Sequence, residues 1–224
     1  MRLLKFLAGF VAVPFLFVSC GSTPKTHEEQ PLLKADYTGQ TGGVVLRPAA
    51  PIRPTIPASP EFILGRGAVD SEKLAKFLLA ANPEIDEPFA HNFARLYVEE
   101  AAVEGVNHDI AFSQMCLETG FLSFNGLVKP EMNNFGGLGA IGPGQEGESF
   151  PSPQIGVRAQ IQHLKAYATE EPPRQAIVDP RYRWVRYGSA PTIFKLSGSW
   201  AADVEYGEKI KRVLDNLYAA VYGQ

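Results

Sequence analysis

Cysteine is scarce in this sequence of 224 residues, which contains only Cys20 and Cys116. Two thiols are too few for the disulfide framework that stabilises many small exported domains. Cys116 lies in an apolar stretch, which predicts a buried and unreactive thiol. A nucleophilic role is the alternative, because Glu118 stands two positions further on, although no histidine is arranged in the sequence to activate the thiol.

Positive charge is also limited, since 21 Lys and Arg face 24 Asp and Glu, for a formal net charge of −3. No long basic run occurs, so nothing favours a nucleic-acid partner. A local cluster of Arg181, Arg183 and Arg186 is interpreted as a solvated face, with contact to an acidic polymer as the alternative. No spacing of His, Asp and Cys indicates a metal site, so we expect no metal and no cofactor.

The N-terminal apolar stretch, residues 6–18, is too short to span a bilayer comfortably. It follows a charged tip with Arg2 and Lys5 and precedes small residues, a pattern typical of a secretory signal. Residues 16–20, Leu-Phe-Val-Ser-Cys, resemble the lipobox of bacterial lipoproteins. The resemblance implies removal of residues 1–19 and lipidation of the Cys20 sulfur. A plain signal peptide with an incidental cysteine is the alternative.

Residues 20–65 are predicted to be a lipid anchor followed by a flexible, proline-rich linker. Prolines at every third position favour an extended, semi-rigid spacer of roughly 3 Å per residue. The prolines with this spacing are Pro48, Pro51, Pro54, Pro57 and Pro60. The remainder, residues 66–224, is long enough for one catalytic domain with a real core.

Helical periodicity dominates this domain, and strand signals are poor. The expected helices are residues 71–81 capped by Asp70, a second opened by Pro88 and ended by Gly105, residues 108–119 capped by Asn107, a fourth from Ser152 or Pro153 to Ala168, a short one at 192–196, and a last one capped by Asp203. Residues 108–119 are apolar nearly all round, which indicates the most buried helix. We therefore predict an all-α domain, with at most a small hairpin in the glycine-rich region 139–150.

Glu118 is the best candidate for chemistry, because it lies at the end of the most apolar predicted helix. Burial raises the pKa of a carboxyl group, and an acid that protonates a glycosidic oxygen near neutral pH needs a raised pKa. The partial negative charge at a helix C-terminus acts in the same direction. An exposed or salt-bridged Glu at a frayed helix end is the alternative.

A loop at residues 133–139, with the sequence NNFGGLG, offers groups that suit a sugar. Asn133 and Asn134 carry amides that can bind hydroxyl and N-acetyl groups, Phe135 can stack on a sugar face, and Gly136 permits close backbone approach. A tight structural turn is the alternative. Gln114 stands one helical turn before Glu118 and is expected either to line the cleft or to satisfy a polar group in the core.

Four segments together resemble the glucosaminidase domain of glycoside hydrolase family 73: Glu118-Thr119-Gly120, residues 133–139, Ser149-Phe150 and residues 200–206 (WAADVEY). The resemblance covers roughly residues 70–222. It implies a lysozyme-like helical domain with a glycine-rich loop beside the cleft, and cleavage after N-acetylglucosamine in peptidoglycan. It also implies roles for single residues: Glu118 as the catalytic acid, Asn134 and Phe135 as shapers of the sugar site, and Tyr206 as an aromatic side chain pointing at the cleft.

This sequence differs from the family in one region. Family members often carry a second acid in a longer hairpin, whereas the corresponding region here, residues 141–148, is short. Glu146 and Glu148 are its only acids, and either is a candidate base or oxocarbenium stabiliser, with a solvated loop acid as the alternative.

The predicted function is that of an endo-β-N-acetylglucosaminidase that acts on the glycan strand of peptidoglycan. We expect a monomer that the lipid on Cys20 holds to a membrane of the bacterial cell envelope. A lytic transglycosylase and a glycan-binding domain without activity are the alternatives.

Overall fold

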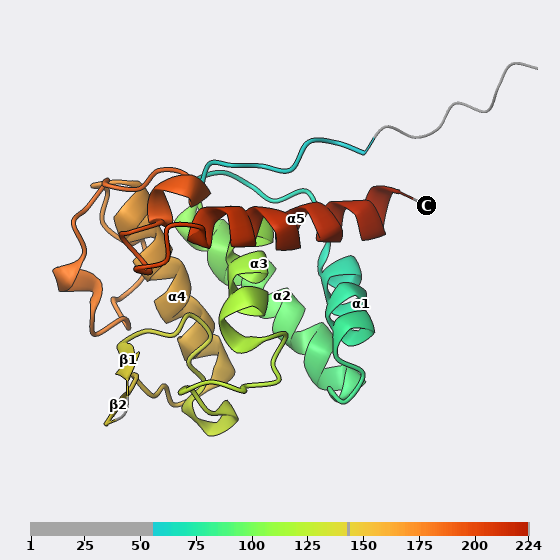
Figure 1. Cartoon of the computed structure of the whole chain (residues 1–224), viewed down its shortest axis with the longest axis horizontal. Coiled ribbons are helices and arrows are strands. Elements are labelled where there is room, and N and C mark those ends of the chain that lie inside the picture. Colours follow the sequence, from blue (N-terminus) through green and yellow to red (C-terminus); the bar gives the residue numbers. More distant parts are fainter. Residues whose placement is uncertain (1–55, 143, 224) are drawn as a thin grey trace, which may run out of the picture. The chain divides into compact units, whose positions relative to one another are not determined.

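The structure is a computed structural model that describes residues 56–142 and 144–223. Helices and one small antiparallel sheet form this part of the chain (Figure 1), which confirms the predicted fold class. The elements are α1 (Ser71–Ala81), α2 (Glu87–Glu104), α3 (His108–Thr119), β1 (Ala140–Gly142), β2 (Gln145–Glu146), α4 (Pro153–Ala168) and α5 (Tyr206–Tyr222), with short 3-10 helices at Pro130–Met132, Tyr182–Trp184 and Ile193–Leu196. The predicted signal peptide, Cys20 and the linker up to residue 55 lie outside the described residues.

Side-chain caps define the helix starts that the sequence predicts. The Asp70 carboxylate accepts a hydrogen bond from the Lys73 N–H at 2.9 Å, and the Ser152 hydroxyl accepts one from the Ile155 N–H at 3.3 Å. Asn107 accepts hydrogen bonds from two N–H groups in the first turn of α3. These bonds satisfy backbone donors that have no partner within the helix.

The prediction that Asp203 caps the last helix is wrong. Residues 203–205 form a tight turn, in which the Asp203 carboxylate accepts a hydrogen bond from the Glu205 N–H at 2.9 Å and pairs with Lys209. Helix α5 therefore begins only at Tyr206. The sequence pattern misleads because an Asp stabilises a turn two residues ahead by the same kind of bond with which it caps a helix.

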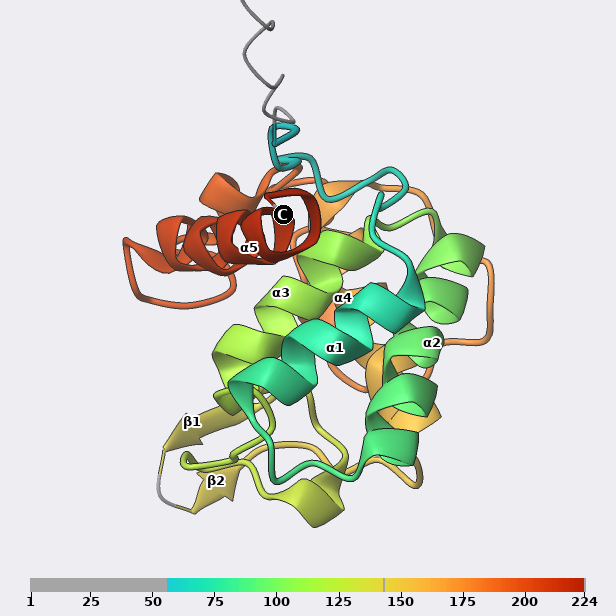
Figure 2. The same cartoon turned by 90° about the vertical axis from the view of Figure 1, so that its right-hand side faces the viewer.

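Helix α3 lies inside the domain, where it contacts α2, α4 and α5. Figures 1 and 2 show α5 on the side of the molecule opposite to the β1–β2 hairpin. Ten of the 12 residues of α3 are buried, which confirms that it is the buried helix that the sequence indicates. Its last turn nevertheless reaches the surface near the loop that precedes β1, because Gly120, in the left-handed conformation with φ 58°, ends the helix there.

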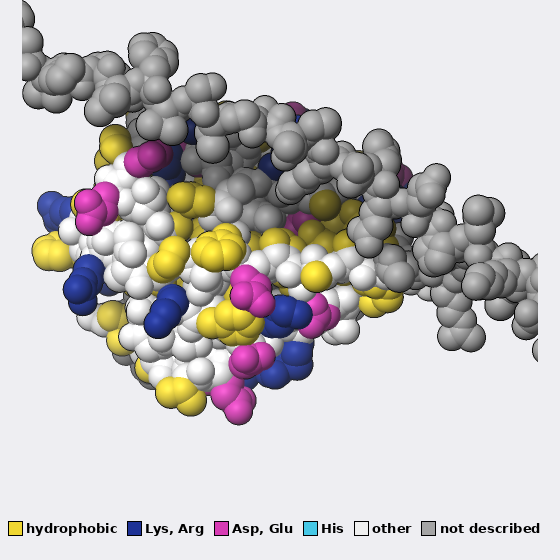
Figure 3. All heavy atoms as spheres, turned by 90° about the horizontal axis from the view of Figure 1, so that it is seen from above, with side chains coloured by type: hydrophobic (Ala, Val, Ile, Leu, Met, Phe, Trp, Pro, Cys, Tyr) yellow, Lys and Arg dark blue, Asp and Glu magenta, His cyan; other side chains and the backbone are white. Residues whose placement is uncertain are grey.

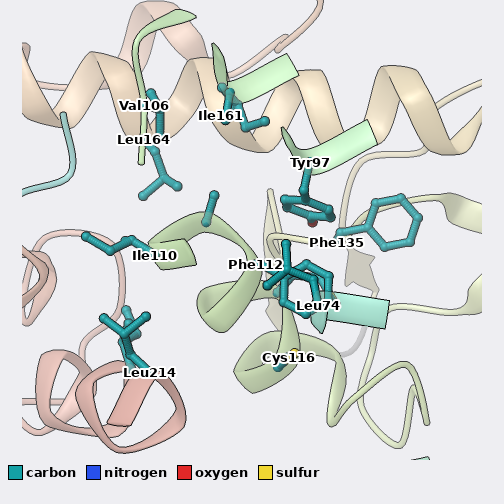
Figure 4. Close-up of a cluster of buried hydrophobic side chains, with 14 of the residues drawn as sticks. Leu74, Tyr97, Val106, Ile110, Phe112, Cys116, Phe135, Ile161, Leu164 and Leu214 are labelled. Atoms are coloured by element: carbon teal, nitrogen blue, oxygen red, sulfur yellow. The ribbon is translucent and has the colours of Figure 1, made fainter. Parts of the chain in front are cut away.

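Aromatic and aliphatic side chains from every α-helix form one core (Figure 4). Tyr97 and Phe112 meet edge to face with their ring centres 5.4 Å apart, and Phe135 joins them from the loop after α3 through Phe93. Cys116 is fully buried in this core, and burial raises the pKa of its thiol far above the ordinary value. The prediction of a buried thiol is confirmed, and the thiol stays protonated and unreactive at neutral pH.

The folded domain starts earlier than the predicted boundary at residue 66. Ile63 is fully buried, its N–H donates to the Pro191 carbonyl at 3.0 Å, and its own carbonyl accepts from the Asn107 N–H at 2.8 Å. The segment just after the prolines is therefore part of the domain rather than of a flexible linker. A single inward side chain gives no periodicity, so the sequence pattern could not reveal it.

The face seen from the α5 side carries basic and acidic side chains interspersed with hydrophobic ones, wherever grey atoms do not cover it (Figure 3). On this visible surface no large field of one charge sign occurs. Within residues 56–142 and 144–223, no helix combines the length and apolar character needed to cross a membrane.

Candidate active site

Glu118 is held by two side chains that come from much later in the sequence. Its Oε1 accepts a hydrogen bond from the Trp200 indole N–H at 3.1 Å and a very short one from the Tyr206 hydroxyl. Trp200 belongs to the turn after the 3-10 helix Ile193–Leu196, and Tyr206 is the first residue of α5. The end of α3 and the beginning of α5 therefore build one carboxylate site.

The surroundings of Glu118 favour its protonated form. Burial raises the pKa of its carboxyl group, while the hydrogen bonds from Tyr206 and Trp200 counteract part of this rise because they stabilise the anion. Burial also raises the pKa of Tyr206 well above its ordinary value, and the neighbouring Glu118 acts in the same direction. Tyr206 thus remains a neutral hydroxyl that can donate, beside an acid that keeps its proton to higher pH than an exposed Glu.

The second carboxyl oxygen of Glu118, Oε2, lies against the backbone of Gly137. A Cβ atom at position 137 would stand 3.0 Å from this oxygen, and Gly137 has φ +64°, a conformation that favours glycine. Glu118, Gly137 and Ala140 line a cavity of about 170 Å³ together with Phe124 and residues 126–128. Two donors therefore hold Oε1 of Glu118, and the carboxyl group of the same residue borders a cavity.

Two more cavities adjoin this one along the glycine-rich loop. Gly137 and Ala140 also line a cavity of about 230 Å³ whose other walls include Trp200, Tyr167 and His163. That cavity shares Arg181 and residues of the loop with a third one, of about 310 Å³, beside β2. The three cavities form a row along residues 136–148, which suits an extended ligand better than a compact one.

The second cavity has an aromatic wall that the fold holds firmly. The rings of His163 and Trp200 meet edge to face with centres 4.9 Å apart, and His163 Nδ1 lies 2.6 Å from the buried Asp179 carboxylate. The Tyr167 hydroxyl donates to the Ser199 carbonyl at 2.8 Å, so the turn that carries Trp200 is tied to α4. The Trp200 indole can therefore be positioned both for Glu118 and for a ligand in the cavity.

Asn134 does not offer its amide to a ligand, so its predicted role in sugar binding is wrong. It is fully buried, its Nδ2 donates to the carbonyls of Leu138 and Glu148, and its Oδ1 accepts from the Leu138 N–H. All three bonds lie within the loop that shapes the site. Asn134 therefore braces the loop from inside, which is the structural-turn alternative.

Phe135 is not a stacking platform beside Glu118, so this prediction is also wrong. It is 3% exposed and packs edge to face on Phe93, with ring centres 4.6 Å apart. Asn133 has φ 50° and donates to the Phe150 carbonyl at 2.9 Å, as a turn residue does. Phe135 and Asn133 border a separate cavity of about 590 Å³ between α1, α2 and the 3-10 helix Pro130–Met132, which Glu118 does not line.

Gly136 provides space for the site rather than a direct contact to Glu118. A Cβ atom there would lie 2.9 Å from the Gln160 side chain and 3.2 Å from the Trp200 ring. Glycine at this position lets Trp200 pack against the loop, and Gly136 also lines the second cavity. The sequence predicts that this glycine lets the backbone approach a ligand. In the structure, the backbone at Gly136 closely approaches the side chains of Gln160 and Trp200.

The two acids of the hairpin lie in the third cavity, not in the one that Glu118 lines. Glu148 is half-buried and its carboxylate is 3.8 Å from the Arg181 guanidinium. Glu146 is exposed on β2. The structure thus brings Glu118 and Tyr206 together and leaves both hairpin acids at the other end of the row.

Gln114 lies in the core, which is the second of its two predicted positions. It is fully buried, and its Nε2 donates to the Tyr206 hydroxyl at 2.9 Å. Trp200 was not predicted as a site residue, although it opens the WAADVEY segment. Its contact to Glu118 spans 82 positions and has no local signal in the sequence.

Among the described residues, no group of three or more His, Cys, Asp or Glu side chains is arranged to hold a metal ion. At the site itself the structure gathers one acid, Glu118, with its two hydrogen-bond donors, the loop that faces it and the row of cavities.

Residues 94–219 match the model of a family described as "Glucosaminidase: Mannosyl-glycoprotein endo-beta-N-acetylglucosaminidase". An uncharacterized protein of Borreliella burgdorferi (strain B31) is 46% identical over 156 residues, which cover 70% of this chain and 76% of that protein. Two solved structures of S. aureus autolysin E are also similar, one with the muropeptide NAM-L-Ala-D-iGlu and one of a catalytic mutant with the disaccharide NAG-NAM. Each is 16% identical, with a TM-score of 0.48 over 72% of both chains. The family match begins in α2 and ends in α5, so it contains Glu118, Trp200 and Tyr206.

Proposed function

Because this chain belongs to the glucosaminidase family, glycoside hydrolase family 73, we propose that it is a peptidoglycan hydrolase, an endo-β-N-acetylglucosaminidase with Glu118 as its general acid. One observation carries the proposal: a carboxyl group with a raised pKa borders a cavity while two neutral donors hold one of its oxygens. A general acid in glycoside cleavage needs this combination, because it must keep its proton until the leaving oxygen is in place.

In the proposed reaction, Glu118 transfers its proton to the glycosidic oxygen as the bond from that oxygen to C1 of N-acetylglucosamine breaks. The electron pair of the bond stays with the leaving oxygen, and C1 becomes oxocarbenium-like. Water adds to C1 and loses a proton to a base. The Trp200 and Tyr206 hydrogen bonds stabilise the Glu118 carboxylate that results.

Glu148 is the better candidate for the base, because it is half-buried beside Arg181, whereas Glu146 is exposed. Its position in the third cavity implies that the hairpin closes over the substrate or that water relays the proton. In the free protein, Glu148 and Glu118 line different cavities.

The row of cavities supports a polymeric sugar substrate. The Trp200 and Tyr167 rings line the cavity next to Glu118, and aromatic rings in such positions pack on the apolar faces of sugars. Arg181 lines this cavity as well, so a cation stands where a glycan strand would pass. The strands of peptidoglycan carry lactyl and peptide carboxylates, and chitin is neutral, so this cation favours peptidoglycan.

A lytic transglycosylase is the second candidate. The observation that favours it is that Glu118 is the only carboxylate among the described residues that line its own cavity. Such an enzyme needs no activated water, because the C6 hydroxyl of the muramic acid residue attacks its own C1. The products then carry anhydromuramic ends. A domain that binds glycan without cutting it is the third candidate, and it gives no reason for an acid with a raised pKa.

Digestion of purified peptidoglycan by the full chain and by Glu118→Gln, followed by mass spectrometry of the product ends, tests the proposal. We expect reducing N-acetylglucosamine ends from the unaltered protein and none from the variant. Anhydromuramic ends would support the transglycosylase. Binding without any release would support the non-catalytic domain, and equal release by both proteins would remove Glu118 from the catalytic role.

We also propose that Cys20 carries a lipid that anchors the protein to the bacterial envelope, on the basis of residues 16–20 alone. Residues 20–60 would then be the tether that lets the domain reach the glycan. Mass spectrometry of the mature N-terminus tests this: a diacylated or triacylated Cys20 is expected, and an unmodified N-terminus elsewhere would contradict it.

A further inference from the structure

A line of buried hydrogen bonds leads from α4 through α3 to Glu118. Gln160 on α4 donates from Nε2 to the Ala111 carbonyl at 3.1 Å and to Gln114 Oε1 at 2.8 Å. Gln114 on α3 donates from Nε2 to the Tyr206 hydroxyl at 2.9 Å, and this hydroxyl donates to Glu118 Oε1. Both glutamines are fully buried and neither lines a cavity beside Glu118.

The direction of this line is fixed at its start. A backbone carbonyl accepts hydrogen bonds and never donates them, so the Ala111 carbonyl requires the NH2 group of Gln160 on its side. The same NH2 group then faces Gln114, which must turn its oxygen towards it. The NH2 group of Gln114 consequently faces the Tyr206 oxygen, and the Tyr206 hydroxyl proton is left to point at Glu118.

We propose that Gln114 and Gln160 are positioning residues that fix the acidic proton of Glu118 on Oε2. The inference rests on the proposed role of Glu118 as general acid. Oε1 receives donors from both Tyr206 and Trp200, so a proton on that oxygen would meet two other protons. The proton is therefore held on Oε2, the oxygen next to Gly137 at the cavity.

Without this chain, Tyr206 could reverse its role. A Tyr hydroxyl can both donate and accept a hydrogen bond, and the Tyr206 oxygen accepts one from Gln114. If Gln114 lost its NH2 group, a protonated Glu118 could turn its own O–H towards the Tyr206 oxygen and away from the cavity. That arrangement stabilises the acid in an unproductive form, so the glutamines act on catalysis without touching the substrate.

The test must separate positioning from plain loss of stability, so it uses Gln114→Met and Gln160→Met, which keep length and lose the amide. Tyr97→Phe is the matched control: it removes a buried hydroxyl that donates to Gln160 Oε1 at 2.5 Å but leaves the Ala111 carbonyl to fix the amide. Besides burial, the pKa of Glu118 depends on the hydrogen bonds from Tyr206 and Trp200, and that of Tyr206 depends on Glu118, Gln114 and Tyr167 of α4. Of these groups, the three variants change only Gln114, in Gln114→Met.

The first readout needs no activity: the Glu118 carboxyl carbon is titrated by NMR in each protein. We expect the pKa of Glu118 to rise by about one pH unit in both glutamine variants, the size of one altered hydrogen bond to a charged group. It should not move in Tyr97→Phe. An unchanged pKa in a folded Gln114→Met protein would overturn the proposal, whether or not the protein cleaves peptidoglycan.

The second readout is kinetic. We expect kcat to fall roughly tenfold with KM unchanged, and the double variant to be no worse than either single one, because both residues act through Tyr206. Additive losses, or losses that follow the unfolded fraction measured by circular dichroism, would overturn the proposal. Absence of activity in the unaltered protein would instead refute the proposed function and leave the titration result standing.

The unaltered protein supplies a further check if the variants fail to fold. The side-chain amide protons of Gln114 and Gln160 should exchange with solvent only on global unfolding. Exchange as fast as that of exposed glutamines would overturn the chain of bonds.

Discussion

Removal of the Tyr206 hydroxyl is the most direct test of how the site sets the acidity of Glu118. The Tyr206 bond stabilises the ionised carboxylate and so lowers a pKa that burial raises. Its loss in Tyr206→Phe must therefore raise this pKa further. Hydrogen bonds to charged groups contribute about 1.5–3 kcal/mol, and one pKa unit corresponds to about 1.4 kcal/mol. The expected shift is about 1–2 units upward.

The assay is the pH dependence of kcat/KM for release of soluble fragments from peptidoglycan. With Glu118 as the proposed general acid, the alkaline limb of this profile reports deprotonation of Glu118 in the free protein, so it should move up by about 1–2 units when one charged hydrogen bond is lost. The maximal rate should fall about tenfold to a hundredfold, because the carboxylate formed in the reaction loses the same bond.

The chain offers a matched control on the same helix. The Tyr218 hydroxyl donates to the buried Asp109 carboxylate at 2.9 Å, far along α5 from Tyr206 and at the opposite end of α3 from Glu118. Tyr218→Phe should lower the Tm and leave the alkaline limb in place. If Tyr206→Phe left the limb unmoved or moved it down, the Tyr206 hydrogen bond would not be what stabilises the ionised form of Glu118.

Further predictions concern the acid, the loop and the hairpin. Glu118→Gln should stabilise the fold at neutral pH, because the raised folded-state pKa of Glu118 makes stability fall as pH rises above the unfolded-state value. Urea unfolding at pH 7 and pH 4 checks this, and the gain should vanish at pH 4. Gly137→Ala places a Cβ 3.0 Å from Glu118 Oε2 at φ +64°; we expect a stability loss of about 1–2 kcal/mol together with loss of hydrolysis, and a fully active variant would contradict the geometry. Asn134→Ala removes three hydrogen bonds of the loop and should cost about 2–3 kcal/mol in thermal unfolding, whereas a polar residue that served only the substrate would leave the Tm unchanged. Glu148→Gln should reduce hydrolysis at least tenfold at unchanged Tm, with Glu146→Gln near the unaltered rate; the reverse order would move the base to Glu146.

The bounds of a helix were predictable where residues next to both of its ends are typical of helix starts and stops. Asp70 and Asn107 cap α1 and α3, and Gly120 ends α3 in the left-handed conformation, so the predicted bounds of both helices hold. The start of α5 was not predictable in the same way. An Asp before a helical pattern indicates either a cap or a turn, and only the packing of Tyr206 against Gln114 and Glu118 selects the turn at residues 203–205.

The loop after α3 illustrates a different limit. Residue types state which hydrogen bonds a side chain can make, not whether the protein itself already uses them. Asn134 has the right chemistry for a sugar, yet the Leu138 and Glu148 carbonyls take both of its donors. Phe135 likewise has a ring that could stack on a sugar, but it is buried in the core against Phe93. A sequence read alone assigns such residues to the ligand because the competing partners lie in other elements.

The burial of α3 both stabilises the domain and raises the pKa of Glu118. Helix α3 is buried on almost every side, so a carboxyl group on its last turn loses water, and the partial negative charge of the helix end disfavours ionisation further. An acid on a surface helix would need special surroundings to keep its proton, whereas here the core supplies them. The remaining requirement is a donor pair at the correct oxygen, and Trp200 and Tyr206 meet it only because a turn and a helix start converge on the end of α3. Mutations in the core of α3 should therefore change the pH profile as well as the Tm, and mutations on the exposed face of α5 should change neither.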